Sequence, residues 1–456
     1  MNEKTLALTD AQIVTPMGIY PGTLHIAGGK IVSIEKKMER RADRVMDVEG
    51  KLVFPGFIDG HVHMMDPGHT ECEEFDRGTA AAAKSGVTTV IEHPRTVPPV
   101  LEPKILKEKA EYLKKKTVIN FGLLGGIIST NLDQAYPMWE AGALGFKVFT
   151  VEVHETPPLL AGELAQLFRS ISRFGGVTLI HAEDDSIVKA NEKELRASGR
   201  KDYMLHTEMH TPEAQMAAVE MVLFVANYAL KGEARAIFAH ISDPACLYKI
   251  NEARLKGIQV YAETMPHYLH LIYEDLKKKG PFVKFTPTVR SPEVVAEMWS
   301  CFNRDLIHLV STDHAPQPRE VVEQGLSDIW KSPLTTGANI DVGSRLMLNA
   351  VSQGKTTAIR LARVMSETPA RLYGLYPRKG VIQVGSDADL VVVDMSRKEK
   401  ITPESIVSKG GWTMYDGMEI QGAPVITFVA GEIVYDYGKV VGKPGMGQFI
   451  TRSPLP

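Results

Sequence analysis

Eight short apolar runs, separated by helix-like stretches, restrict most strongly how this chain can fold. The strand-like runs cover residues 57–63, 87–93, 118–124, 144–150, 177–182, 236–241, 259–264 and 307–312. The stretches between them that have helix-like composition are 71–85, 102–116, 133–141, 160–174, 212–231, 244–256 and 292–303. Strands that alternate with helices form parallel sheets, and near-continuous apolar strands are typical of a sheet covered on both faces. The pattern therefore predicts an α/β protein built on a (β/α)8 TIM-type barrel.

Short strand-like runs with glycine-containing turns lie at both ends of the chain, outside the predicted barrel. They cover residues 6–8, 25–27 and 31–34 near the start, and 389–394, 425–429 and 432–435 near the end. We expect both sets to combine in one small β-sandwich domain. The predicted organisation is a β-sandwich of residues 1–54 and 376–440, a catalytic barrel of residues 55–375, and a C-terminal tail of residues 441–456.

Composition restricts the class of function. The 456 residues are 44% hydrophobic and 23% charged, which is enough apolar material for a large core. A net charge of −3 does not favour binding to nucleic acid or to an anionic membrane surface. No apolar run reaches membrane-spanning length, and the first residues show no apolar signal segment. With three cysteines, too few for a disulfide framework, we expect a cytoplasmic protein without nucleic-acid or membrane partners.

Two histidines close the first predicted barrel strand. His61 and His63 are separated by one residue, so on a strand their side chains point to the same side and can reach one metal ion. Taken alone, such a pair is more often two unrelated surface or capping histidines. Active sites of barrel enzymes lie at the C-terminal ends of the strands, and this position favours a metal site.

Four more possible metal ligands lie at or after the ends of later predicted strands: Lys147, His181, His240 and Asp313. Each alone has an ordinary explanation, as a salt-bridged or snorkelling lysine, a core or capping histidine, or a helix N-cap. A carbamylated lysine would instead be anionic and could bridge two metals, once it has lost its proton. Their joint placement predicts a metal centre. Imidazole and oxygen ligands without thiolate favour Zn²⁺, with Mn²⁺, Co²⁺ or Fe²⁺ as alternatives.

The segments around these residues resemble the amidohydrolase superfamily, and within it the cyclic-amide group of hydantoinase, dihydropyrimidinase, allantoinase and dihydroorotase. Residues 55–63 (PGFIDGHVH), 263–269 (ETMPHYL) and 385–390 (GSDADL) carry the resemblance. It implies two divalent metal ions, one held by His61, His63 and Asp313 and the other by His181 and His240, with a CO2-derived carbamate on Lys147 bridging both.

The same resemblance implies a reaction and an assembly. The reaction is the opening of a small cyclic amide or ureide by attack of a metal-activated hydroxide on the ring carbonyl. Asp313 is the implied catalytic residue, which takes a proton and passes it to the leaving ring nitrogen. Relatives in this group are often homotetramers or dimers, so a homo-oligomer is expected.

The sequence leaves the ring itself open. Residues 67–73 resemble an allantoinase-type loop. The arginine that dihydroorotases carry after the H-x-H pair is replaced by Met64 and Met65. The tyrosine that D-hydantoinases carry five residues after the carbamylated lysine is replaced by Glu152. The leading interpretation is a hydantoinase- or allantoinase-like enzyme. The alternatives are a dihydroorotase-like enzyme, another amide hydrolase on the same metal centre, or a noncatalytic scaffold homologue.

Four residues are predicted to contact the substrate. By the resemblance, Thr286 matches the residue whose backbone contacts the ring in hydantoinases, and Gly337 belongs to another substrate loop. Arg95 follows the second predicted strand and could face the pocket, although a structural salt bridge explains it equally well. His314 is a further candidate; like Glu183, it could instead orient a metal ligand or cap a loop.

Overall fold

Within residues 5–153 and 156–452, which the computed structural model describes, eight consecutive strands form one parallel sheet. The strands are β6 (Phe57–Val62), β7 (Val87–Glu92), β8 (Asn120–Gly126), β9 (Gly145–Phe149), β10 (Val177–His181), β11 (Arg235–Phe238), β12 (Val260–Thr264) and β13 (Leu309–Val310). The sheet curls so that its two edges meet, and the amide of His63 donates to the carbonyl of His314 at 2.7 Å. The predicted barrel is confirmed.

Helices cover the barrel where the sequence predicts them: α1 (Phe75–Lys84), α2 (Pro103–Leu113), α3 (Ala135–Glu140), α4 (Ala161–Ile171), α7 (Pro212–Ala229), α8 (Pro244–Leu255) and α11 (Pro292–Asn303). Three of them begin at a proline preceded by a capping side chain, since Thr211, Asp243 and Ser291 each accept a backbone N–H from the first turn. Proline has no N–H to leave unsatisfied there, and the cap satisfies another. These local signals explain why the predicted starts agree with the structure.

The sequence analysis missed several helices that lie between the predicted elements. They are α5 (Asp185–Ala197), α6 (Leu205–Met209), α9 (Pro266–His270), α10 (Tyr273–Lys279), α12 (Arg319–Glu323), α13 (Gly343–Ser352), α14 (Ala358–Ala362) and α15 (Thr368–Leu372). In α5 the one buried residue is Val188. Ile187 packs on the same small apolar cluster as Val188. A helix with so few apolar positions has only a short apolar stripe, which is a weak signal in the sequence.

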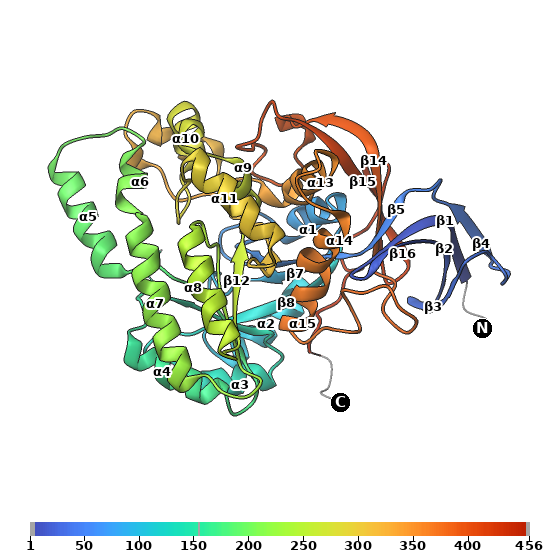
Figure 1. Cartoon of the computed structure of the whole chain (residues 1–456), viewed down its shortest axis with the longest axis horizontal. Coiled ribbons are helices and arrows are strands. Elements are labelled where there is room, and N and C mark those ends of the chain that lie inside the picture. Colours follow the sequence, from blue (N-terminus) through green and yellow to red (C-terminus); the bar gives the residue numbers. More distant parts are fainter. Residues whose placement is uncertain (1–4, 154–155, 453–456) are drawn as a thin grey trace.

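The predicted β-domain made from both ends of the chain is confirmed. Its strands are β1 (Thr5–Thr15), β2 (Gly18–Ala27), β3 (Lys30–Glu35), β4 (Arg44–Asp47), β5 (Leu52–Pro55), β14 (Leu390–Lys400), β15 (Glu419–Val429), β16 (Glu432–Asp436) and β17 (Lys439–Val440). Among the described residues they form one continuous nine-stranded sheet, because β5 pairs with both β1 and β14. Figure 1 shows the N-terminal and C-terminal strands together on one side of the barrel. Leu8, Leu24 and Phe428 belong to a separate apolar core of this domain.

The predicted tail packs back onto the barrel. The amide of Phe121 on β8 donates to the carbonyl of Gln448 at 2.9 Å, and the amide of Ile450 donates to the carbonyl of Phe121 at 2.8 Å. Ile450 is buried. The last four residues of this predicted tail, and the first four of the predicted β-domain, lie outside the described residues.

Two further expectations concern cysteines and membranes. Cys72, Cys246 and Cys301 are all free thiols in buried positions. In the part of the chain that the structure describes, no helix combines the length and the apolar character needed to cross a bilayer.

A buried ion pair connects the ends of β6 and β7 to α2. The Lys109 ammonium donates to Glu92 at 3.2 Å and to the carbonyl of His93 at 2.8 Å. The other oxygen of Glu92 accepts the amide of Met64 at 2.9 Å. Because both charged side chains are buried, the pair determines how the chain leaves two neighbouring strands.

We expect Lys109→Met to lower the free energy of unfolding by about 3–5 kcal/mol, because it leaves the buried Glu92 carboxylate without its partner. Chemical denaturation followed by circular dichroism measures the change. Lys107→Met, at an exposed position on the same helix, is the matched control and should stay within about 0.5 kcal/mol of the parent. A loss below about 1 kcal/mol in Lys109→Met would contradict a structural role for the pair.

Candidate metal centre and substrate pocket

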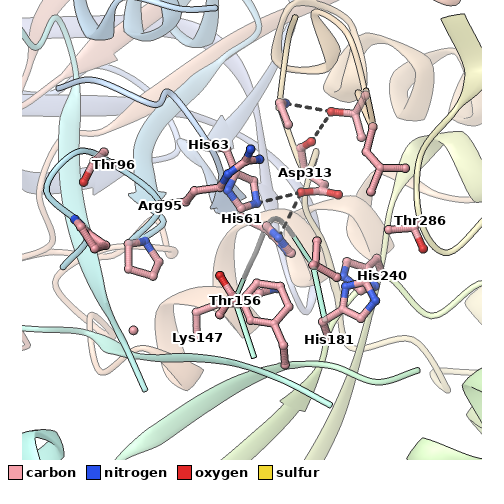
Figure 2. Close-up of a pocket in the computed structure, with 18 of the residues that line it drawn as sticks. His61, His63, Arg95, Thr96, Lys147, Thr156, His181, His240, Thr286 and Asp313 are labelled. Atoms are coloured by element: carbon pink, nitrogen blue, oxygen red, sulfur yellow. Dashed lines mark hydrogen bonds and ion pairs between the residues drawn. The ribbon is translucent and has the colours of Figure 1, made fainter. Parts of the chain in front are cut away.

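The six predicted metal ligands converge at the C-terminal ends of the barrel strands. There they line one cavity of about 610 Å³, and Figure 2 shows their side chains around it. They are His61 on β6, Lys147 on β9 and His181 on β10, together with His63, His240 and Asp313, which follow β6, β11 and β13. Residues far apart in the sequence therefore meet because the strand ends of the barrel lie together.

One carboxylate oxygen faces two imidazoles. Oδ1 of Asp313 lies 3.1 Å from Nε2 of His61 and 3.2 Å from Nε2 of His63. Burial alone would raise the pKa of Asp313, but the two histidines outweigh burial and lower this pKa well below its usual range. An anion and two imidazoles at such short distances form a group of donors that a divalent cation can share.

Two buried carboxylates orient histidines of the site. Nδ1 of His61 lies 2.8 Å from Glu263, and Nε2 of His181 lies 2.7 Å from Glu183. Because an ionised carboxylate can only accept, each pair places the proton on that ring nitrogen and leaves the other nitrogen free for a ligand. Glu183 thus has the orienting position that the sequence suggested, whereas the role of Glu263 was missed.

Strained backbone follows two of the barrel strands. His240 has a φ of 39° and Asp313 a φ of 50°. Both angles lie in the left-handed region of backbone conformation, which residues other than glycine rarely adopt. Such conformations persist where surrounding structure enforces them, and they cluster at functional sites. Nδ1 of His240 is also buried without a hydrogen-bond partner among the described residues.

Lys147 is buried, with 2% of its surface exposed. Within the described ranges its side chain forms no hydrogen bond or ion pair, and its ammonium lies 5.0 Å from the ring of Phe149. Burial lowers the pKa of Lys147 to about 8, so a neutral amine is accessible near neutral pH. A buried lysine without a partner is costly, and conversion to an anionic carbamate would make it a ligand. The donor set, made of imidazole and oxygen groups without a thiolate, fits divalent ions such as Zn²⁺.

His93 is a histidine of the site that the sequence analysis missed. It follows β7, its side chain is buried, and neither ring nitrogen has a partner among the residues described. Its ring stacks on His61 at 4.1 Å between centroids and meets His63 edge-on at 4.3 Å. The ring nitrogens of these three histidines lie close enough to share a metal ion. The signal was available in the sequence, because His93 ends a predicted barrel strand as His63 does.

The four predicted substrate contacts separate into two groups. Arg95 and Thr286 line the cavity. His314 does not line it, because its buried ring turns away to Glu73 at 3.1 Å. Gly337 also lies behind the cavity wall, to which its neighbours Thr335 and Thr336 contribute. The positions of His314 and Gly337 therefore favour support of the wall over contact with a ligand.

Three residues that bear on the choice of ring in the sequence analysis, Met64, Met65 and Glu152, do not line the cavity either. Met64 and Met65 are buried and do not line it. Glu152 is exposed and forms an ion pair with Lys189 at 2.8 Å.

Comparison with known proteins gives matches over nearly the whole chain. The model of the amidohydrolase family matches residues 52–434. The chain is 34% identical to an L-hydantoinase of Paenarthrobacter aurescens over 97% of both chains, and 32% identical to an allantoinase of Deinococcus radiodurans over 96% of this chain and 97% of that one. A solved L-hydantoinase (dihydropyrimidinase) from Arthrobacter aurescens superposes with a TM-score of 0.96 at 32% identity, covering 99% of this chain and 100% of the other. The matches extend through the barrel and the β-domain.

Proposed function

Because this chain belongs to the amidohydrolase family, we propose that it is a hydrolase that opens the ring of a small cyclic amide or ureide, in the manner of a hydantoinase or an allantoinase. The observation that carries the proposal is the convergence of four histidines, Asp313 and the unpaired, buried Lys147 on one cavity. The similarity to an L-hydantoinase and an allantoinase along the full chain supports the substrate class.

We assign two divalent metal ions to this centre, with zinc as the ion that the donors favour. His61, His63 and Asp313 would hold one ion, His181 and His240 the other, and a carbamate on Lys147 would bridge them. The neutral amine of Lys147 adds to CO2 and loses a proton in forming this carbamate. When bound, two such ions acidify a water molecule and polarise the substrate carbonyl.

The carboxylate of Asp313 is suited to carry the proton of the reaction. Its Oδ1 is shared by His61 and His63, whereas Oδ2 forms no hydrogen bond with any residue that the structure describes. Because the pKa of Asp313 is held low, the group is ionised and can accept a proton from the attacking water. We assign to Oδ2 the transfer of this proton to the ring nitrogen as the C–N bond breaks.

A substrate panel tests this proposal. The purified chain, supplied with zinc and bicarbonate, is assayed by chromatography on hydantoin, dihydrouracil, allantoin, dihydroorotate and succinimide. We expect ring opening of at least one of them, with the activity lost on chelation and restored by zinc. A folded, metal-loaded protein inactive on all five rings would contradict the proposal and favour a noncatalytic scaffold.

We expect Glu263→Gln to weaken metal binding about 10- to 100-fold, because His61 loses the carboxylate that fixes its ring. The shift is measured as the chelator concentration at which half of the metal is lost. Glu297→Gln, which changes an exposed carboxylate beside Tyr248, should leave that concentration unchanged. Equal midpoints for the two variants would show that His61 is oriented by other contacts.

A further inference from the structure

Arg95 is a cation of the cavity wall that has no partner among the described residues. It lies in the loop after β7 and lines the cavity together with His61, His63 and Asp313. Its guanidinium forms no hydrogen bond or ion pair with the residues described in the structure. Partial burial lowers the pKa of Arg95, a sign that the charge is poorly solvated. Among the described residues, none forms the structural salt bridge considered as an alternative for Arg95.

Three carboxylates among the described residues of this region have other partners. Asp313 is shared by His61 and His63, and Glu71 pairs with His69 at 3.2 Å. Glu73 accepts from His314 at 3.1 Å. An unpaired guanidinium in a partly buried wall carries a desolvation penalty that no counter-charge offsets. Its planar set of N–H donors can bind a carboxylate through two parallel hydrogen bonds.

The wall beside Arg95 is mainly apolar; Thr96 also lines it, and its hydroxyl donates to the carbonyl of Pro98 at 3.0 Å. Pro99 and Leu101, from the same loop, and Ile127 and Ile128, from the loop after β8, line the cavity. These four apolar side chains accommodate a hydrocarbon group. A ligand that fits both features has a short aliphatic arm with an anion at its end.

We infer that Arg95 binds a carboxylate carried on the ring substituent, so that the preferred substrates are anionic cyclic amides or ureides. This inference rests on the proposed hydrolase function, which supplies the ring and its position at the metal centre. It places the anion at the loop after β7. The position after the H-x-H pair, which carries arginine in dihydroorotases, is occupied here by buried methionines. Dihydroorotate belongs to the same chemical class and is one arm of the test.

The test compares two substrates that differ only in charge, hydantoin-5-acetate and hydantoin-5-acetamide, with dihydroorotate and its amide as a six-membered pair. The quantity measured is the ratio of kcat/KM for the carboxylate to kcat/KM for the amide. For at least one pair, we expect this ratio to be about 10 to 100 in the parent enzyme. It should fall close to one in Arg95→Met and be partly kept in Arg95→Lys. Arg169→Met, at an exposed position on α4, should keep the parent ratio.

A parent ratio of one or less for both pairs, or an unchanged ratio in Arg95→Met, would overturn the inference. Equal activity on acid and amide would refute the role of Arg95 and leave the hydrolase function intact, whereas inactivity on every ring would refute the hydrolase function. If Arg95→Met proved inactive on all substrates, the salt dependence of KM in the parent enzyme would test the inference instead. A KM that rises with salt for the carboxylate alone supports the inference, and the same salt response for both substrates contradicts it.

Discussion

Lys147→Ala should abolish the binuclear metal site and lower kcat/KM by about a thousandfold or more, because the bridging ligand is lost and with it several kcal/mol of transition-state stabilisation. Metal analysis should find the content reduced from two ions per chain to one or none. Short carboxylates such as formate or acetate, which fit the space vacated by the side chain, should restore part of the activity. Retention of two metals and full activity would show that Lys147 is not the bridge.

Lys284 provides the matched control for this variant. It is also buried, and burial lowers its pKa to about 8 as well. Its ammonium, however, donates to the carbonyls of Ile329 at 2.9 Å and Ser332 at 2.6 Å. Lys284→Ala should therefore keep both metal ions. A loss of metal in both variants would indicate that the effect of Lys147→Ala comes from removing any buried lysine.

The second large effect is expected for Asp313→Asn, in which kcat should fall about 10²- to 10⁴-fold. The amide oxygen of asparagine can still approach His61 and His63, but the side chain cannot take up a proton at neutral pH. Steady-state kinetics combined with metal analysis separates these two roles. We expect kcat to fall while most of the bound metal is kept. Asp243→Asn, which changes the cap of α8, should retain parent kcat, and a similarly small change in Asp313→Asn would refute the proton-transfer role.

The barrel could be predicted because its signals are local. Each strand is a short apolar run covered on both faces, and several helices begin at a capping residue followed by proline, as at Thr211 and Pro212. The helix α5 also begins at a capping residue, Asp184, but no proline follows it and only Ile187 and Val188 pack on an apolar cluster. The pairing of β5 with β14 was also out of reach, because nothing in a short strand specifies a partner more than 300 residues away.

The candidate site could be predicted where position along a strand determines the geometry. His61, Lys147 and His181 lie on barrel strands that end at the cavity, so their convergence follows from the fold. The direction of a side chain in a loop is not determined in this way. Arg95 and His314 both follow barrel strands, yet one lines the cavity and the other binds Glu73 behind it.

Side-chain contacts between different barrel strands could likewise not be predicted from the sequence. Glu263 belongs to one of the segments that carry the family resemblance, but it acts on His61, which is 202 positions away in the chain. Such a contact is visible only once the strands are closed into a barrel. The residues that orient ligands are therefore the part of a site that a sequence alone reveals least.

A crystal structure of the chain, grown with zinc and bicarbonate and measured at the zinc absorption edge, tests the central claim most directly. We predict two anomalous peaks, about 3.5–4 Å apart, within the group of His61, His63, His181, His240 and Asp313. Continuous density for a carbamate should extend from Lys147 to both peaks. One peak or none, or an unmodified lysine beside two metals, would contradict the assignment of a carbamate-bridged binuclear centre.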